Sequence, residues 1–126
     1  MNLLLDTNAL IWLLSEPERL ADAVLAHIED TANTVYVSVV SVWEIGIKAS
    51  KGKFRSPPNL EQVLEQQRFQ TLPITLRHAY AVEKLPDHHG DPFDRMLISQ
   101  AQLDDLVLVT SDRMMQRYPI AVLPAV

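Results

Sequence analysis

Short apolar segments alternate along this chain with longer segments of helical periodicity. Three of the short segments are rich in Leu, Val or other β-branched and aromatic residues, which is typical of buried strands: Leu3–Leu5, Thr34–Ser38 and Leu106–Val109. Further strands are predicted at Thr71–Ile74 and Ala121–Leu123. Because segments with helical spacing separate these strands, the pattern predicts an α/β fold with a mainly parallel sheet.

The predicted helices carry apolar residues three and four positions apart, and Pro17 suits the start of one of them. They are expected at Thr7–Leu14, from Pro17 through Ile28, and at Val39–Ser50, Leu60–Phe69, Thr75–Lys84 and Pro92–Leu103, with a helical turn at Ser111–Gln116. Loops are expected at Phe54–Asn59 and Pro86–Asp91. No internal repeat or linker interrupts this order, so residues 1–126 are expected to form a single domain.

Four acidic residues stand at unusual positions in this pattern. Asp6 directly follows the first predicted strand, and Asp112 closely follows the strand at Leu106–Val109. Glu44 interrupts an apolar helix, and Asp94 lies in the first turn of another. Ligands of parallel α/β sheets bind beyond the carboxyl ends of the strands, where Asp6 and Asp112 are expected. Converging carboxylates are typical ligands of Mg²⁺ or Mn²⁺, so the four acids predict one metal site.

Helix capping is a simpler explanation for three of these acids. Asp6 and Asp112 can each cap the helical segment that follows, because Asp is a favoured N-cap residue. Asp91, Pro92 and Asp94 fit the positions N-cap, N1 and N3 of one helix. Asp91 is therefore interpreted as a cap first and a site residue second, whereas Asp94 can serve in both ways.

Glu44 is the discriminating residue because it lies inside a helix, where no cap accounts for it. The simpler explanation is an ion pair with Lys48 four residues later, which stabilises a helix by only about 0.2–0.5 kcal/mol. A partly buried carboxylate needs more compensation than that. A metal ion or its bound water would supply the compensation.

Other polar residues near the four acids are weaker candidates. Thr7 and Ser111 flank the acids and are predicted to hydrogen-bond carboxylates or metal-bound water, and Asp91 is placed with them. Basic residues beside the acids are predicted to contact phosphate groups: Lys48, Lys51, Arg95 and Arg113. The adjacent residues His88 and His89 are interpreted as solvated loop residues rather than as a zinc site.

Composition narrows the chemistry. The chain has a net charge of −5, no cysteine and three glycines. These counts exclude a disulfide scaffold and a thiolate metal site, agree with a reducing cytoplasm, and argue against a glycine-rich phosphate loop and a nucleotide cofactor. No apolar run approaches the roughly 20 residues that span a membrane, and the N-terminus lacks a basic signal region. Metal-dependent phosphodiester hydrolysis is the reaction class that best uses the acids, since two divalent cations would neutralise them.

Four segments, in this order, resemble those of PIN-domain proteins, specifically VapC-like toxins of type II toxin–antitoxin modules. They are Leu4–Leu10, Val37–Ile45, Asp91–Ile98 and Leu108–Asp112, and the likeness runs nearly from end to end. The resemblance implies a Rossmann-like three-layer α/β/α fold and a Mg²⁺- or Mn²⁺-dependent endoribonuclease that cuts single-stranded RNA. It also implies a homodimer silenced by a small VapB-like antitoxin.

The resemblance also implies roles for individual residues. Asp6 and Asp94 would be the principal metal ligands, Glu44 would hold a metal or orient the attacking water, and Asp112 would complete the site, partly through water. Position 8 is Asn, where relatives often carry His, so no role is carried over to it. Two alternatives remain open, namely a PIN nuclease of RNA maturation and a PIN domain that binds a partner without turnover.

Overall fold

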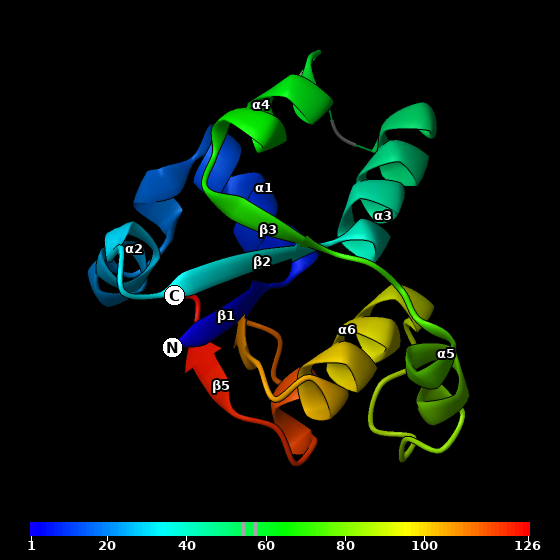
Figure 1. Cartoon of the computed structure of the whole chain (residues 1–126). Helices are drawn as coiled ribbons and strands as arrows, with labels where there is room; N and C mark the ends of the chain where they lie inside the picture. Colours follow the sequence, from blue (N-terminus) through cyan, green and yellow to red (C-terminus); the bar gives the residue numbers. More distant parts are fainter. Residues whose placement is uncertain (54, 57) are drawn as a thin grey trace.

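The computed structural model describes residues 1–53, 55–56 and 58–126 and shows a five-stranded parallel sheet (Figure 1). The strand order is β3-β2-β1-β4-β5, and every neighbouring pair runs parallel. The strands are β1 (Asn2–Leu5), β2 (Thr34–Ser38), β3 (Phe69–Leu72), β4 (Val107–Thr110) and β5 (Val122–Pro124). The α/β fold and the mainly parallel sheet predicted from the sequence are confirmed.

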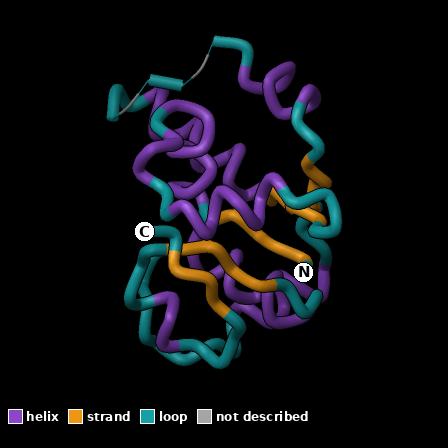
Figure 2. The backbone as a smooth tube through the Cα atoms, turned by 90° about the vertical axis from the view of Figure 1, so that its left-hand side faces the viewer, coloured by secondary structure: helices purple, strands orange, loops and turns teal. Residues whose placement is uncertain are grey.

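Helices cover both faces of the sheet, which gives the three-layer α/β/α arrangement (Figure 2). Successive residues of a strand point to opposite faces, so Leu3 and Leu5 enter one core while Leu4 enters the other. All three leucines are fully buried. The central position of β1 therefore explains why its apolar run is uninterrupted.

The helices are α1 (Thr7–Ser15), α2 (Asp22–Glu29), α3 (Val39–Ser50), α4 (Leu60–Gln66), α5 (Leu76–Val82) and α6 (Pro92–Leu103). Two short 3₁₀ turns are η1 (Pro17–Arg19) and η2 (Met115–Arg117). No helix in these described segments is long and apolar enough to cross a membrane. The predicted loop Phe54–Asn59 includes Phe54 and Pro57, which lie outside the described residues.

Two predicted helices were wrong in extent. The helix expected from Pro17 is broken after η1, because Leu20 and Ala21 are extended and the Ala21 amide donates to the Ala125 carbonyl at 2.9 Å. The helix expected to reach Phe69 ends three residues earlier. Phe69 instead begins β3, where it pairs with Val35 of β2 and packs against the core.

Helix caps fix the entrances of the three helices around the carboxyl ends of the strands. Asp6 caps α1, Ser38 caps α3 and Asp91 caps α6, each through its side-chain oxygen. The capping interpretation of Asp6 and Asp91 is therefore correct. Because Asp6 is itself a site acid and the Asp91 cap accepts from the Asp94 amide, the starts of α1 and α6 also set the geometry of the site.

Candidate functional site

The four predicted acids come from four different elements at the carboxyl edge of the sheet. Asp6 follows β1 and Asp112 follows β4, and these strands are neighbours in the sheet, with Leu5 paired to Val109. Glu44 lies on α3 and Asp94 on the first turn of α6. The charges of Glu44 and Asp112 both act on Asp6, and those of Glu44 and Asp6 act on Asp94. The structure therefore brings the acids into one electrostatic site.

Asp6 is buried at the centre of this site. Its side chain is 4% exposed, and one oxygen accepts a 2.7 Å hydrogen bond from the Ala9 amide. Burial raises the pKa of Asp6 to about 6, with smaller contributions from the charges of Asp112 and Glu44, although hydrogen bonds from Thr110 and Ala9 oppose the shift. Capping thus accounts for the position of Asp6 but does not balance its charge.

The negative charge of Asp94 is even less well compensated by neighbouring groups than that of Asp6. Burial raises the pKa of Asp94 to about 7, and the negative charges of Asp91 and Glu44 add to the shift, while His89 lowers it. An acid with a pKa near 7 carries a full charge at neutral pH only at a cost in free energy. Asp6 and Asp94 therefore create a local excess of negative charge that a cation would relieve.

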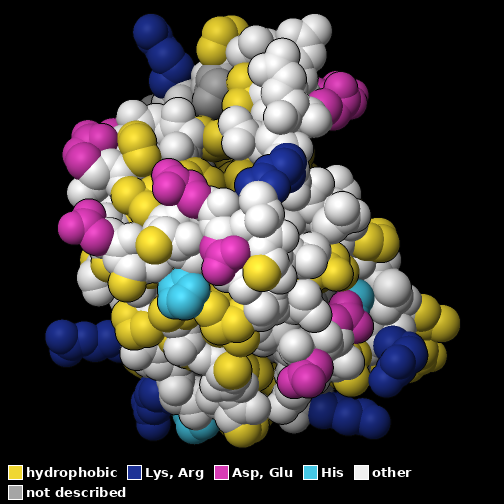
Figure 3. Space-filling view, turned by 60° about the vertical axis from the view of Figure 1, so that its left-hand side comes forward, with side chains coloured by type: hydrophobic (Ala, Val, Ile, Leu, Met, Phe, Trp, Pro, Cys, Tyr) yellow, Lys and Arg dark blue, Asp and Glu magenta, His cyan; other side chains and the backbone are white. Residues whose placement is uncertain are grey.

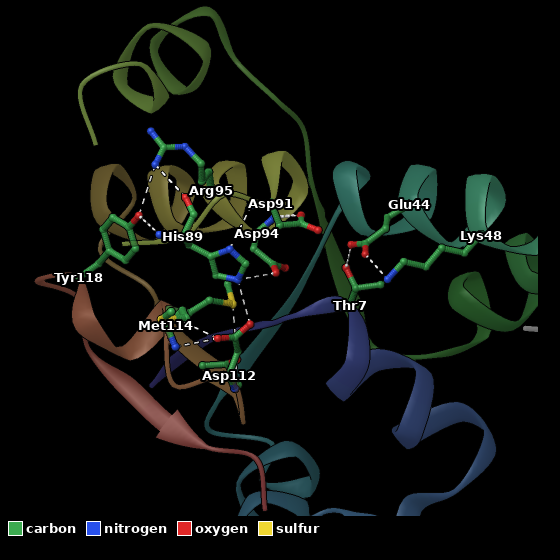
Figure 4. A network of polar contacts seen from close by, with 12 residues as sticks. Thr7, Glu44, Lys48, His89, Asp91, Asp94, Arg95, Asp112, Met114 and Tyr118 are labelled. Atoms are coloured by element: carbon green, nitrogen blue, oxygen red, sulfur yellow. Dashed lines mark hydrogen bonds and ion pairs between the residues drawn. The ribbon is translucent and has the colours of Figure 1, made fainter. Parts of the chain in front are cut away.

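Glu44 is held by the protein itself (Figure 4). Its side chain is buried, one carboxylate oxygen accepts from the Thr7 hydroxyl at 2.6 Å, and the other lies 2.6 Å from the Lys48 ammonium. Because a hydroxyl carries one proton, Thr7 gives it to Glu44 and accepts from Ser41, whose Oγ lies 3.0 Å away. The hydrogen bond to Glu44 raises the pKa of Lys48.

This arrangement corrects the sequence interpretation of Glu44. The ion pair with Lys48 is present, and Thr7 completes it, so the protein supplies the compensation that was assigned to a metal ion or water. Thr7 was expected to hydrogen-bond a carboxylate or metal-bound water, and it contacts Glu44. From the sequence, only Lys48, four residues along the same helix, is identifiable as a partner of Glu44. The Thr7 hydroxyl comes from α1, a different helix, and its contact depends on the tertiary structure.

His89 is the residue that sequence reasoning missed. It is not a solvated loop residue: its side chain is 14% exposed, and its Nε2 lies 2.9 Å from Asp112 Oδ2 and 3.0 Å from Asp94 Oδ2. Its Nδ1 accepts from the Asp91 amide at 3.0 Å. His88 is half-buried and its ring meets Tyr118 edge-on. The only signal in the sequence was the position of both histidines just before the Asp91 cap.

Asp112 lies on the less buried side of the site. Its side chain is 34% exposed, and one oxygen accepts hydrogen bonds from the amides of Met114 and Met115. Burial alone would raise the pKa of Asp112, but the hydrogen bond with His89 and these amides outweigh it, so the pKa is lowered. Asp112 is thus ionised and aimed at the site by the turn that follows β4.

Of the four basic residues predicted to contact phosphate, two bind other groups of the protein and two are exposed to solvent. Arg95 was placed wrongly, because its guanidinium points into the loop before α6 and donates to several backbone carbonyls and to the Tyr118 hydroxyl. Lys48 is engaged with Glu44. Lys51 and Arg113 are exposed at the surface, while Ser111 is half-buried beside Asp112.

The donor set fits a hard divalent cation. Carboxylate oxygens dominate it, and among the described residues the ligand atoms of Asp94, Asp112 and His89 all lie within 4.8 Å of one another. Asp6 and Asp94 are buried next to other carboxylates, and these two causes raise the pKa of both acids. Asp94 and Asp112, together with the charge of the buried Asp6, form a candidate acidic metal site, and Glu44 lies next to it with its charge already balanced by Lys48 and Thr7.

Comparison with known proteins agrees with this fold. A family model described as the PIN domain matches residues 3–121. Ribonuclease VapC22 of Mycobacterium tuberculosis is 30% identical over 118 residues, which cover 91% of this chain and 90% of the relative. Two structures under 25% identical show likeness of fold. They are VapBC2 from Rickettsia felis, solved with a promoter DNA fragment, and DNA-bound VapBC from Salmonella typhimurium.

The Rickettsia structure has a TM-score of 0.74 at 18% identity and covers 98% of both chains. The Salmonella structure has a TM-score of 0.74 at 21% identity and covers 98% of this chain and 97% of that chain. The family model spans the strands and helices that carry all four acids. On this match, together with the fold and a VapC relative of nearly equal length, the chain belongs to the PIN-domain family.

Proposed function

We propose that this chain is a Mg²⁺- or Mn²⁺-dependent endoribonuclease that cleaves single-stranded RNA, acting as the toxin of a VapBC-type module. The observation that carries the proposal is the cluster of Asp94, Asp112 and His89, whose ligand atoms all lie within 4.8 Å of one another, next to the buried carboxylate of Asp6. A bound divalent cation would activate water and stabilise the leaving oxygen of the phosphodiester. The similarity to a VapC ribonuclease supports RNA as the substrate.

Each acid would contribute differently to the reaction. Asp6, fixed by the α1 amide, and Asp94, on the first turn of α6, hold the cation from two rigid helix starts. Glu44 is kept in one orientation by Thr7 and Lys48, so it can accept a proton from, or orient, a water molecule at a fixed place. Asp112 closes the site from the more exposed side.

RNA contacts would come from local groups rather than from a broad basic surface. The net charge is −5, and the face in Figure 3 shows Lys and Arg side chains dispersed among acidic and hydrophobic ones. Lys51 and Arg113 are exposed on segments that carry site acids and would contact phosphates. Recognition would then depend on a single-stranded loop that reaches the acidic site.

The direct test is RNA cleavage with and without Mg²⁺. Asp6→Ala should abolish cleavage while circular dichroism shows a folded protein, and cleavage by this variant at the wild-type rate would exclude the proposed site. Expression of the wild-type chain alone should arrest growth, and Asp94→Ala should relieve the arrest. A wild type that cleaves RNA but permits growth would favour the RNA-maturation alternative, and one that does neither would favour a binding module.

The proposal includes a VapB-like antitoxin, as in the VapBC complexes that share the fold. A groove of about 760 Å³ lies between α3, α4 and β3, and its lining is mostly apolar. It includes Val42 and the 59%-exposed Trp43 of α3 together with Leu60 and Leu64 of α4. An amphipathic antitoxin helix is the kind of segment that such a groove accommodates.

A homodimer is also part of the proposal, and the exposed apolar residues of and beside α5 would be its contact. They include Ile74, Leu76 and Tyr80. Val42→Glu should prevent co-purification with the antitoxin and leave the mass in solution unchanged, whereas Leu76→Glu should have the opposite effects. Identical behaviour of the two variants would exclude this division of the surface.

A further inference from the structure

Two histidines of this chain have the same pattern of ring contacts but different surroundings, one in a helix and the other in a loop. His78 Nδ1 accepts from the Thr75 amide at 3.0 Å, and His89 Nδ1 accepts from the Asp91 amide at 3.0 Å. Because an N–H group points at each Nδ1, the proton of each neutral ring is assigned to Nε2. Both rings therefore present an Nε2–H donor to whatever faces them.

The acceptors distinguish the two rings. His78 is 2% exposed and faces the single carboxylate of Asp104 at 2.9 Å, which ties α5 to the end of α6. His89 faces two carboxylates, Asp112 and Asp94, at 2.9 and 3.0 Å. Two carboxylates this close repel one another, and a donor between them lowers that repulsion.

The loop that carries His89 is tied down by several hydrogen bonds (Figure 4). The Tyr118 hydroxyl accepts from the His89 amide at 3.0 Å and donates to the Pro86 carbonyl at 2.6 Å. Arg95 donates to the carbonyls of Val82, Leu85, Pro86 and His89 at 3.0–3.2 Å. These contacts hold the backbone on both sides of the ring, so the place of His89 between the two acids is fixed by the fold.

We propose that His89 is a positioning residue, whose Nε2–H holds Asp112 Oδ2 and Asp94 Oδ2 facing one another so that a divalent cation meets a preformed pair. The inference rests on the proposed metal-dependent function. Direct ligation by Nε2 would need the proton on Nδ1, which already faces the Asp91 amide. Asp112 depends most on this contact, because its other oxygen is used by the turn that follows.

The test is Mn²⁺ affinity, measured by isothermal titration calorimetry on the full chain. His89→Ala should weaken Mn²⁺ binding by about 10–100-fold, the usual effect of removing a residue that orients metal ligands. His89→Gln should recover most of the affinity, because its amide can still donate to the carboxylates. If Gln binds as weakly as Ala, the donor role is wrong.

His78→Gln is the matched control, because it alters the same kind of ring outside the site. It should lower the melting temperature but leave Mn²⁺ affinity unchanged, and an equal loss of affinity would reduce the role of His89 to general stability.

A second check is the double variant. In an Asp112→Asn background, His89→Ala should lose most of its effect on Mn²⁺ binding, and undiminished additivity would contradict the proposal.

Failure of this inference is distinguishable from failure of the proposed function. A wild-type chain that binds no Mn²⁺ overturns the metal-dependent function, and the role of His89 with it. A wild type that binds Mn²⁺ and cleaves RNA, with His89→Ala binding equally well, overturns only the role of His89. Electron-spin-echo spectra of bound Mn²⁺ should show no directly coordinated nitrogen, and such a signal would make His89 a ligand instead.

Discussion

On one side of the acidic site Glu44 is satisfied by its neighbours, whereas on the other side Asp94 and Asp112 share one histidine. Glu44 has an ammonium and a hydroxyl, one on each carboxylate oxygen. Asp94 shares a single donor, the Nε2–H of His89, with Asp112, and burial raises the pKa of Asp94 to about 7. The same chemical group, a carboxylate, is thus balanced in one place and unbalanced in the other, because the number of donors around it differs.

The comparison shows where a cation is needed. On the α3 side, both oxygens of Glu44 already have partners in the protein. Glu44 is therefore a fixed group around which a water or metal can be placed. The α6 side, together with Asp6, carries the unbalanced charge that metal binding would relieve. Substitutions on the two sides are therefore expected to change stability in opposite directions.

The largest effect is expected on the Glu44 side. Lys48→Met leaves the buried Glu44 carboxylate with Thr7 alone, so the free energy of unfolding should fall by about 3 kcal/mol. Urea denaturation of the metal-free protein measures the change. Glu44→Gln is the matched variant, and it should destabilise less, because the Lys48 ammonium that it leaves behind is 37% exposed and can reach water. A neutral result for Lys48→Met would mean that the ion pair is not formed in solution.

The next effect is a dependence on pH that comes from Asp6. Its folded pKa of about 6 exceeds the ordinary value of 3.8, so the folded state binds more protons than the unfolded state between these pH values. Stability of the metal-free protein should therefore fall as pH rises from 4 to 7, by on the order of 3 kcal/mol from Asp6. The difference between wild type and Asp6→Asn isolates this contribution, and parallel curves would exclude it.

Metal binding should reverse that loss. At a Mn²⁺ concentration a hundredfold above Kd, the free energy of unfolding should rise by about 2.7 kcal/mol, and a chelator should remove the gain. Thermal unfolding at neutral pH with and without Mn²⁺ is the measurement. Asp94→Asn should lose most of the gain, whereas Asp104→Asn, which lies at the other end of α6, should keep it.

The smallest effect is expected on the α6 side without metal. Asp94→Asn removes an unbalanced charge but also weakens the contact with His89, which offsets part of the gain, so the metal-free protein should become more stable by about 1–2 kcal/mol at pH 8. The same variant should fail to cleave RNA. Together with a destabilised Glu44→Gln, this result would confirm that the two sides differ in sign. Destabilisation by both variants would remove the contrast.

Much of the fold could be predicted because strong local patterns specify it. Leu3–Leu5 is buried on both faces, and Val39–Ser50 and Pro92–Leu103 begin at caps that the sequence contains, so their bounds were right. The break after Pro17 could not be predicted. It depends on a hydrogen bond from Ala21 to Ala125, at the far end of the chain.

For the site, the positions of the acids could be predicted from the sequence, but the orientations of His89 and Arg95 could not. Asp6 and Asp112 were placed by the rule that parallel strands end at one edge, and the structure puts them there. His89 and Arg95 were misjudged because their partners are distant in sequence: Asp112 for the histidine, and the carbonyls before α6 for the arginine. Position next to an acid says nothing about which way a long side chain turns.

The sequence by itself determined the parallel α/β order and which carboxylates stand at strand ends and helix starts, since these follow from periodicity and capping over a few residues. Only the tertiary structure decided how the acids are partnered. Thr7 reaches Glu44 and His89 reaches Asp112 because α1 meets α3 and the loop before α6 meets the turn after β4. The balance of charge at the site depends on such long-range donors, and no local pattern encodes them.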